Sequence, residues 1–146
     1  MKRKISVLGI ILFFLASGLV WAADKMMSYS IAEAIGNTKV QEALIPDVRL
    51  YWGEQSHPAI EKMYGEFKTS KRTNALGKSK ETACRWALAA GLKVLQDRAL
   101  REGGNAVVNI RSNIRNNEKS SATEFECLIG SVVVNSALIG DVVKLK

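Results

Sequence analysis

One stretch of the chain, from Ser79 to Glu102, carries the strongest helical pattern of apolar residues. Apolar residues recur there at spacings of three and four, which places them on one face of an α-helix. The residues on this face are Cys84, Leu88, Leu92, Leu95 and Ala99. Ser79, with Thr82, forms an N-terminal cap, and Gly103–Gly104 ends the helix because glycine adopts the left-handed conformation without steric cost. We therefore expect one long helix with a buried face.

The residues after this helix alternate between apolar and polar, which indicates β-strands. In the first strand, the apolar residues are Val108, Ile110 and Ile114, and the polar residues of an exposed face are Asn109, Arg111 and Asn113. In the second strand, the apolar residues are Phe125, Cys127 and Ile129, with Glu124 and Glu126 facing outward. Asn116–Asn117, within a polar stretch that ends at Ser121, is expected to supply the turn of a hairpin.

One register of this hairpin makes the two apolar faces match. Ile110 would lie opposite Phe125, and Val108 opposite Cys127. Arg111 would then lie near Glu124, so that opposite charges meet across the strands.

Shorter elements are expected around this core. Ser30 and Glu33 form a capping box for a short helix, and Thr38 caps a second one that ends before Pro46. These helices cover Ile31–Ile35 and Thr38–Leu44. Strands are expected at Val48–Trp52, more weakly at Gly65–Ser70, at Val132–Val134 as an extension or bend, and at Val142–Leu145 as an edge strand. Gly53–Pro58 reads as a loop, and a basic, polar loop is expected to lead from the weak strand to Gly77.

Length and composition favour a single globular domain. The chain has 146 residues, of which 47% are hydrophobic and 24% charged, and domains usually contain about 100–200 residues. These values exclude a disordered or collagen-like chain. The pattern as a whole predicts an α+β fold, with one long helix packed on a mainly antiparallel sheet.

The first 22 residues have the layout of a secretory signal peptide. Lys2, Arg3 and Lys4 precede an uncharged apolar run from Ile5 to Val20. Val20 and Ala22 then stand at the −3 and −1 positions of a cleavage site. An uncleaved membrane anchor is the alternative, although the run is shorter than the ~20 residues that span a membrane. We expect a signal peptide over residues 1–22, a domain over 23–146, no transmembrane anchor after cleavage, and a periplasmic or secreted bacterial protein.

Export changes the significance of the net charge. The full chain has 21 basic and 14 acidic residues, a formal charge of +7, which on its own would suggest nucleic acid or a membrane surface as partner. Without Lys2, Arg3 and Lys4 the basic residues number 18, so the charge falls to about +4. We therefore expect no nucleic-acid partner.

Export also bears on Cys84 and Cys127, the only two cysteines. An even number of cysteines in an oxidising compartment favours a disulfide, here Cys84–Cys127. Two separate buried thiols, or a metal site, are the alternatives. A tetrahedral metal site needs about four ligands, and His57 is the only histidine. The sequence predicts no metal and no cofactor.

One motif resembles a known family. Ala99–Arg111, which reads ALREGGNAVVNIR, and the later segment GSVVV resemble the core of the YbjQ-type family, small α+β domains labelled as heavy-metal-binding. Over nearly its whole length the chain also resembles small exported bacterial proteins that carry the label "excinuclease ATPase subunit". These resemblances imply a YbjQ/RcsF-like fold, the second name being that of a disulfide-bearing envelope-stress sensor. The chain departs from them in having few cysteines and histidines and no lipoprotein cysteine.

The ATPase label does not agree with the residues. A phosphate-binding loop has the pattern G-x-x-x-x-G-K-[ST], and Gly77-Lys78-Ser79 matches its end. Arg72, however, stands where the first glycine belongs. We therefore interpret Gly77–Ser79 as a loop and helix cap and expect no excinuclease or ATPase activity.

The remaining polar residues form no catalytic constellation. Asp97 and Glu102 are expected to pair with Arg98 or Arg101, and Glu124 and Glu126 with Arg111 and Arg115. A carboxylate pair or cation site is the alternative for Glu124 and Glu126. His57 could act as a general base on a loop, and Tyr51 and Trp52 could frame a ligand.

The segment from Lys68 to Lys80 contains five basic residues and no acidic one. They are Lys68, Lys71, Arg72, Lys78 and Lys80. Such a segment is either a solvated loop or an anion-binding surface for envelope material, which the N-terminus of the following helix would reinforce.

Taken together, these features predict a non-catalytic binding, sensing or assembly module of the cell envelope. Its partner would be an envelope component or a protein, and a homo-oligomer is compatible with the sequence. A small hydrolytic or metal-dependent enzyme that uses His57 and nearby carboxylates is the alternative.

Overall fold

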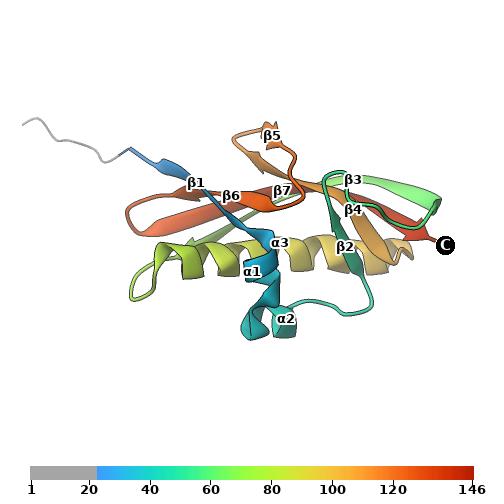
Figure 1. Cartoon of the computed structure of the whole chain (residues 1–146), viewed down its shortest axis with the longest axis horizontal. Helices are drawn as coiled ribbons and strands as arrows, with labels where there is room; N and C mark the ends of the chain where they lie inside the picture. Colours follow the sequence, from blue (N-terminus) through green and yellow to red (C-terminus); the bar gives the residue numbers. More distant parts are fainter. Residues whose placement is uncertain (1–22) are drawn as a thin grey trace, which may run out of the picture.

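The computed structural model describes residues 23–146, so the signal peptide predicted over residues 1–22 lies outside the described residues. A seven-stranded, mostly antiparallel sheet carries the long helix on one face, an α+β arrangement (Figure 1). In chain order the elements are β1 Lys25–Ser30, α1 Ile31–Gly36, α2 Thr38–Ala43, β2 Arg49–Trp52, β3 Ile60–Asn74, α3 Lys80–Glu102, β4 Ala106–Ile114, β5 Asn117–Lys119, β6 Glu124–Ile129 and β7 Val133–Leu145. The face of the sheet away from α3 is called the open face below.

The last strand, β7, is the centre of the sheet. It pairs with β3 along one side, and with the end of β6 and then β4 along the other. The predictions of a bend at Val132–Val134 and an edge strand at Val142–Leu145 are therefore wrong: one strand of 13 residues runs from Val133 to Leu145. Gly140 interrupts the apolar pattern but lets the sheet pack closely, since a Cβ there would lie 2.7 Å from Cγ1 of Val107.

β3 is far longer than the predicted strand Gly65–Ser70. It extends over 15 residues, and the loop before α3 is correspondingly short. β3 pairs only with β7, so its outer edge has no backbone partner among residues 23–146. Its alternation is hard to detect because an edge strand needs few apolar residues: opposite Leu138 and Ser136 it presents Thr69 and Lys71.

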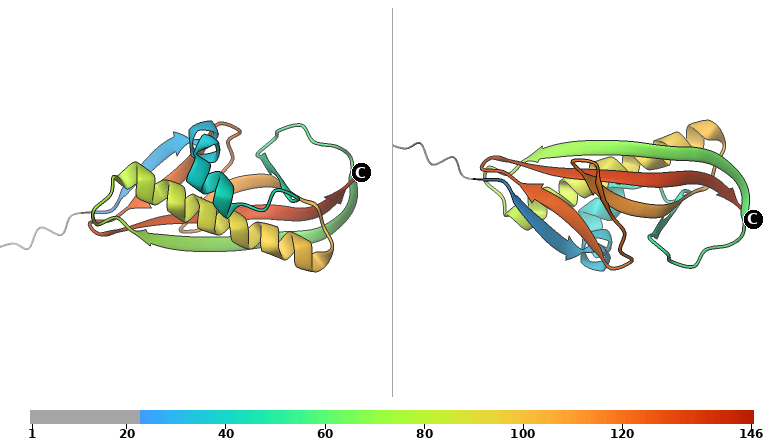
Figure 2. Two further views of the ribbon diagram at one scale, coloured as in Figure 1. Left: turned by 90° about the horizontal axis from the view of Figure 1, so that it is seen from below. Right: turned by 90° about the horizontal axis from the view of Figure 1, so that it is seen from above.

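The long helix α3 agrees closely with the prediction. The hydroxyl of Ser79 accepts a hydrogen bond from the backbone N–H of Thr82, and Gly103 adopts the left-handed conformation (φ 86°). The five residues of the predicted buried face are all buried: Cys84, Leu88, Leu92, Leu95 and Ala99. They pack against β7 and β3, and Figure 2 shows α3 lying across the sheet with α1 and α2 beside it. No helix within residues 23–146 is both long and apolar enough to cross a membrane.

β4 has no exposed face, contrary to the alternation of its sequence. A bulge shifts the pattern: Val108 pairs with Asp141 and Arg111 with Ile139, so three steps along β4 match two along β7. Asn109, at the bulge, has a φ of 50°. Val108 consequently joins a small apolar cluster separate from the core that contains Ile110.

The predicted hairpin register is wrong as well. β4 pairs with the short β5 through a turn at Arg115 and Asn116, whose φ angles are 55° and 61°. β6 pairs instead with β1, with Phe125 opposite Tyr29 and Cys127 opposite Met27. The strand β1 was not predicted, although Lys25–Ser30 contains Met26, Met27 and Tyr29.

Both short helices form where the sequence places them. The hydroxyl of Ser30 accepts a hydrogen bond from the N–H of Glu33, as the capping box predicts. The cap of α2 is Asn37 rather than Thr38, because Oδ1 of Asn37 accepts from the N–H groups of Lys39 and Val40.

Gln96, on α3, holds the segment that follows α2. It is buried, and its Oε1 accepts from the backbone N–H of Ile45 (2.8 Å). Its Nε2 donates to the carbonyl oxygens of Ile45 (2.9 Å) and Val48 (2.8 Å). One side chain thus satisfies three backbone groups of a segment that has no regular structure.

Cys84 and Cys127 lie at disulfide distance, joining α3 to β6 (Cα–Cα 6.0 Å). Both residues are fully buried. β6 shares only two residue pairs with β7, at Leu128 and Ile129. The disulfide is therefore a principal link between the β1–β6 ribbon and the rest of the molecule.

Replacing both cysteines, as Cys84→Ala with Cys127→Ala, should destabilise the fold. The two residues are 43 apart, and closing a loop of this size contributes about 4 kcal/mol in the chain-entropy account. Urea unfolding of the oxidised protein and of the double variant measures the difference. Equal unfolding midpoints, or quantitative alkylation of two thiols in denatured, unreduced protein, would contradict it.

Gln96→Leu should cost about 3 kcal/mol of unfolding free energy, because leucine leaves buried backbone groups of Ile45 and Val48 unpaired. Gln41→Leu is the matched control, since the side chain of Gln41 is exposed and makes no hydrogen bond among the described residues. Urea unfolding gives the stability, and hydrogen exchange at the Ile45 amide reports the local effect. Unchanged exchange at Ile45 in Gln96→Leu would show that these bonds do not hold the segment.

Candidate functional site

An open hollow of about 520 Å³ lies between α1, α2, the segment after α2, and β2. We call it the apolar hollow, and its main lining residues are Ile31, Ile35, Leu44, Ile45, Leu50 and Trp52. Ile35, Leu44, Ile45 and Leu50 are only half-buried, so their aliphatic surface is accessible from the hollow. The segment after α2 makes a turn closed by the hydrogen bond from the N–H of Val48 to the carbonyl of Ile45 (3.2 Å), and Gln96 holds this turn in place as one wall of the hollow.

Trp52 contributes a buried polar atom to the residues that line the hollow, beside the amides of Gln41, Gln55 and Gln96. Its side chain is 3% exposed, and its indole N–H makes no hydrogen bond with any described residue. The backbone N–H of Trp52 donates to Oε1 of Gln55 (2.7 Å), and Nε2 of Gln55 donates to the carbonyl of Ala122 (3.4 Å). Buried polar groups are normally paired, and an unpaired one costs about 1–3 kcal/mol. The indole N–H of Trp52 is therefore a buried hydrogen-bond donor without an acceptor among the described residues.

His57 lies outside the apolar hollow, on the loop after β2. It is exposed, and its ring meets Tyr51 edge-on with centroids 5.6 Å apart. Its Nδ1 lies 2.8 Å from the carbonyl oxygen of Pro58. Among residues 23–146, no three His, Cys, Asp or Glu side chains gather where they could hold a metal ion.

The basic residues predicted as one anion-binding surface are spread over different places. Lys68, Lys71 and Arg72 stand on the strand β3 rather than on a loop, and β3 alternates. Lys68 and Arg72, opposite Ile139 and Asn135, face the open face, whereas Lys71, opposite Ser136, faces the side of α3. The structure therefore separates residues that are adjacent in sequence.

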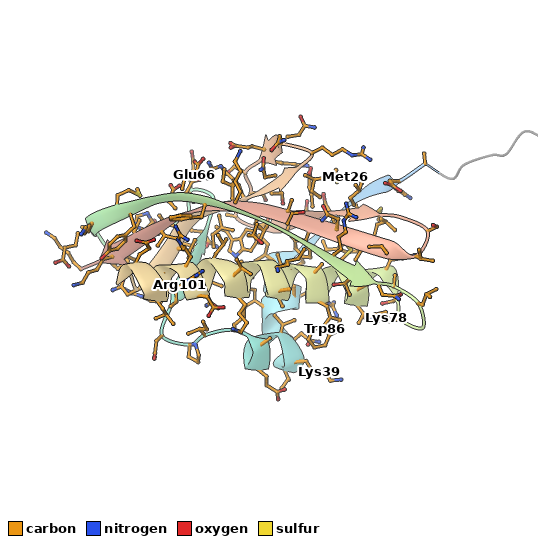
Figure 3. The ribbon with its side chains drawn as sticks, turned by 180° about the vertical axis from the view of Figure 1, so that it is seen from behind. Met26, Lys39, Glu66, Lys78, Trp86 and Arg101 are labelled. Atoms are coloured by element: carbon orange, nitrogen blue, oxygen red, sulfur yellow. A yellow bond between two sulfur atoms is a disulfide. The ribbon has the colours of Figure 1, made fainter. Side chains whose placement is uncertain are left out.

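The other two basic residues bind backbone near the start of α3. Nζ of Lys78 donates to the carbonyl of Asn74 (2.8 Å), and Nζ of Lys80 donates to those of Gly130 (3.3 Å) and Ser131 (3.1 Å). Figure 3 shows Lys78 at the tip of the loop, far along the molecule from Glu66 on β3. Gly77–Ser79 forms the loop and helix cap that we expected.

Arg111 has partners other than the predicted Glu124. It is 9% exposed and its Nη2 binds Glu66 (2.6 Å), while its Nε binds Glu118 (3.2 Å). Burial lowers the pKa of Arg111, but the hydrogen bonds with Glu118 and Glu66 outweigh it and raise the pKa. The guanidinium thus ties the β5 hairpin over the open face.

Asp141 lies beside this ion-pair cluster. Burial raises the pKa of Asp141, and the hydrogen bond from Asn109 (3.4 Å) and the charge of Arg111 partly oppose that rise. Each of these groups has a structural partner, so we assign the cluster to holding the hairpin rather than to chemistry.

The other predicted carboxylates pair on the surface. Asp97 binds Lys93 (3.2 Å) rather than an arginine, and Glu102 binds Arg98 (3.0 Å). Glu126 binds Lys119 (3.4 Å), and Arg115 binds Asp24 (3.5 Å). The sequence pattern indicated Trp52 as a ligand-framing residue; it missed Gln96 and the aliphatic residues after α2, whose shared wall only the tertiary structure brings together.

Comparisons with known protein families, with curated proteins and with solved structures found no significant match to this chain.

Proposed function

We propose that this chain is an exported, non-catalytic binding module of the cell envelope, and that the apolar hollow holds a small aliphatic ligand with a carbonyl oxygen. The observation that carries the proposal is the buried indole N–H of Trp52, which has no partner within residues 23–146 and belongs to a residue that lines a mainly apolar hollow. A carbonyl oxygen is the simplest acceptor for such a donor.

The size and lining of the hollow support a small ligand. Its volume, about 520 Å³, falls within the usual 300–1,000 Å³ of small-molecule sites, which are mostly apolar with a few placed polar groups. Aliphatic, indole and amide side chains line it. Such side chains bind through apolar burial and a hydrogen bond, and they carry no charge to hold an anionic group.

The disulfide-distance pair Cys84–Cys127 supports export, because disulfides persist in oxidising compartments. The signal-peptide layout of residues 1–22 adds to this proposal. On the resemblance of Ala99–Arg111 to the YbjQ-type family we propose that the fold is YbjQ/RcsF-like. We do not propose the alternative enzyme around His57, since the interactions of its ring within residues 23–146 are with Tyr51 and Pro58.

Methyl octanoate should bind the purified protein and shift the indole N–H resonance of Trp52 in a saturable way. The resonance is assigned by its loss in Trp52→Phe, which should bind about tenfold more weakly because it keeps an apolar ring but removes the donor. Octane, which has no acceptor, should bind without the large indole shift.

Leu44→Glu, which places a charge in the hollow, should abolish methyl octanoate binding, whereas Leu100→Glu is the matched control. Leu100 is 49% exposed on α3 and does not line the hollow. Equal binding by both variants, or no saturable shift up to the solubility limit of the ester, would contradict the proposed site.

A further inference from the structure

Two hollows of mixed polar and apolar lining, of about 650 and 370 Å³, lie side by side near the β6–β7 turn and on the open face, and they share no lining residue with the apolar hollow. Both are lined by Arg115 and Asn135. The smaller one also contains Lys68 and Asn113, and the larger one Arg72. The two hollows together are called the Arg115 site.

The charge of the Arg115 site is predominantly positive. Lys68 and Arg72 form no ion pair among residues 23–146, and both are exposed. Arg115 pairs with Asp24, the one carboxylate of the lining, at 3.5 Å. Both partners are largely exposed, and pairs of that kind are weak enough to exchange for a ligand anion.

The floor of the site supplies neutral hydrogen-bonding groups. Asn113 is only 7% exposed, yet its side-chain amide makes no hydrogen bond with any described residue. Its amide atoms are not among the fully buried unpaired ones, so they retain accessible surface and can bind a ligand or solvent in the hollow. Nδ2 of Asn135 donates to Oγ of Ser70 (2.9 Å) and to the carbonyl of Lys71 (3.1 Å), which orients its Oδ1 as a remaining acceptor.

We propose that the Arg115 site binds an anionic saccharide. Guanidinium groups bind carboxylate or phosphate oxygens in bidentate fashion, and Arg72 and Arg115 supply two of them. Amide side chains both donate to and accept from hydroxyl groups, as Asn113 and Asn135 can. A flat anionic surface such as a lipid bilayer would meet the exposed cations but not the recessed amide of Asn113.

The Arg115 site contains only part of the basic segment that runs from Lys68 to Lys80. Lys68 and Arg72 belong to it, and Arg115, remote in sequence, completes it. Lys71, Lys78 and Lys80 do not line it. The chain therefore provides its own control, because removing two charges at Lys71 and Lys78 changes the net charge as much as removing them at Lys68 and Arg72.

The experiment is calorimetric titration of the purified protein with trigalacturonate, the carboxylate probe, and with glucose 6-phosphate, the phosphate probe, at about 20 and 150 mM salt. Maltotriose and inorganic phosphate test whether hydroxyls or charge alone suffice. We expect at least one anionic sugar to bind at both salt concentrations, at least tenfold more tightly than maltotriose and inorganic phosphate.

Three variants and one control variant locate the site. Lys68→Ser with Arg72→Ser should weaken binding at least tenfold, while Lys71→Ser with Lys78→Ser should leave it within about twofold. Arg115→Asn, which suits the left-handed turn at that position, should also weaken binding at least tenfold. Asn113→Ala, which alters no charge, should weaken binding several-fold, and shifts of the Asn113 side-chain amide resonances on titration report the contact even if that variant is unstable.

Several results would overturn the inference. Equal losses in the two double variants would show only long-range attraction, and binding by phosphatidylglycerol vesicles without binding of either sugar would show a lipid surface. No saturable binding of either sugar, with the Asn113 amide resonances unmoved, would show that the hollow holds solvent alone. Because the Arg115 site is separate from the apolar hollow, none of these results depends on methyl octanoate binding.

Discussion

The close approach of α3 to the centre of the sheet is the constraint on which the remaining structure depends. Two glycines make it possible, one on each side. A Cβ at Gly140 of β7 would lie 3.4 Å from Leu95 of α3, and one at Gly91 of α3 would lie 3.3 Å from Leu138 of β7. With both glycines in place, the helix reaches the strand closely enough for Gln96 to hold the segment beyond α2 and for Cys84 to reach Cys127.

Sequence patterns predicted those elements whose signal is local. The helix α3 was predicted with both ends, since Ser79 and Gly103 cap it through their own conformations. The strands were predicted less well, because their limits depend on neighbours. Only Gly65–Ser70 of β3 was predicted as a strand, and the part with Lys71 and Thr73 was expected to be a loop, because an edge strand tolerates such polar residues. The bulge at Asn109 reversed an alternation that the residues alone suggest. The apolar face of β6 could pair with β4 or with β1. The structure pairs it with β1, and only the arrangement of the complete sheet decides between these two partner strands.

The candidate sites show the same division. The sequence indicated Trp52 as a residue that could frame a ligand. It did not indicate the other walls of the apolar hollow, which come from α1 and from the segment after α2. The basic segment was recognised, yet strand alternation sends Lys68 and Lys71 to opposite faces and gives Lys68 a new neighbour in Arg115. On the free edge of β3 such lysines also discourage pairing with a strand of another molecule.

The place of β7 in the chain has a consequence for when the protein can fold. The central strand follows β3, β4 and β6 in the chain, and β3 has no other strand to pair with. β1, the first described strand, waits for β6 near the other end of the chain. During synthesis the sheet therefore has no centre on which to assemble until β7 has been made, and contacts so distant in sequence form slowly. Until β7 has been made, both edges of β3 are unpaired and open to strands of other chains.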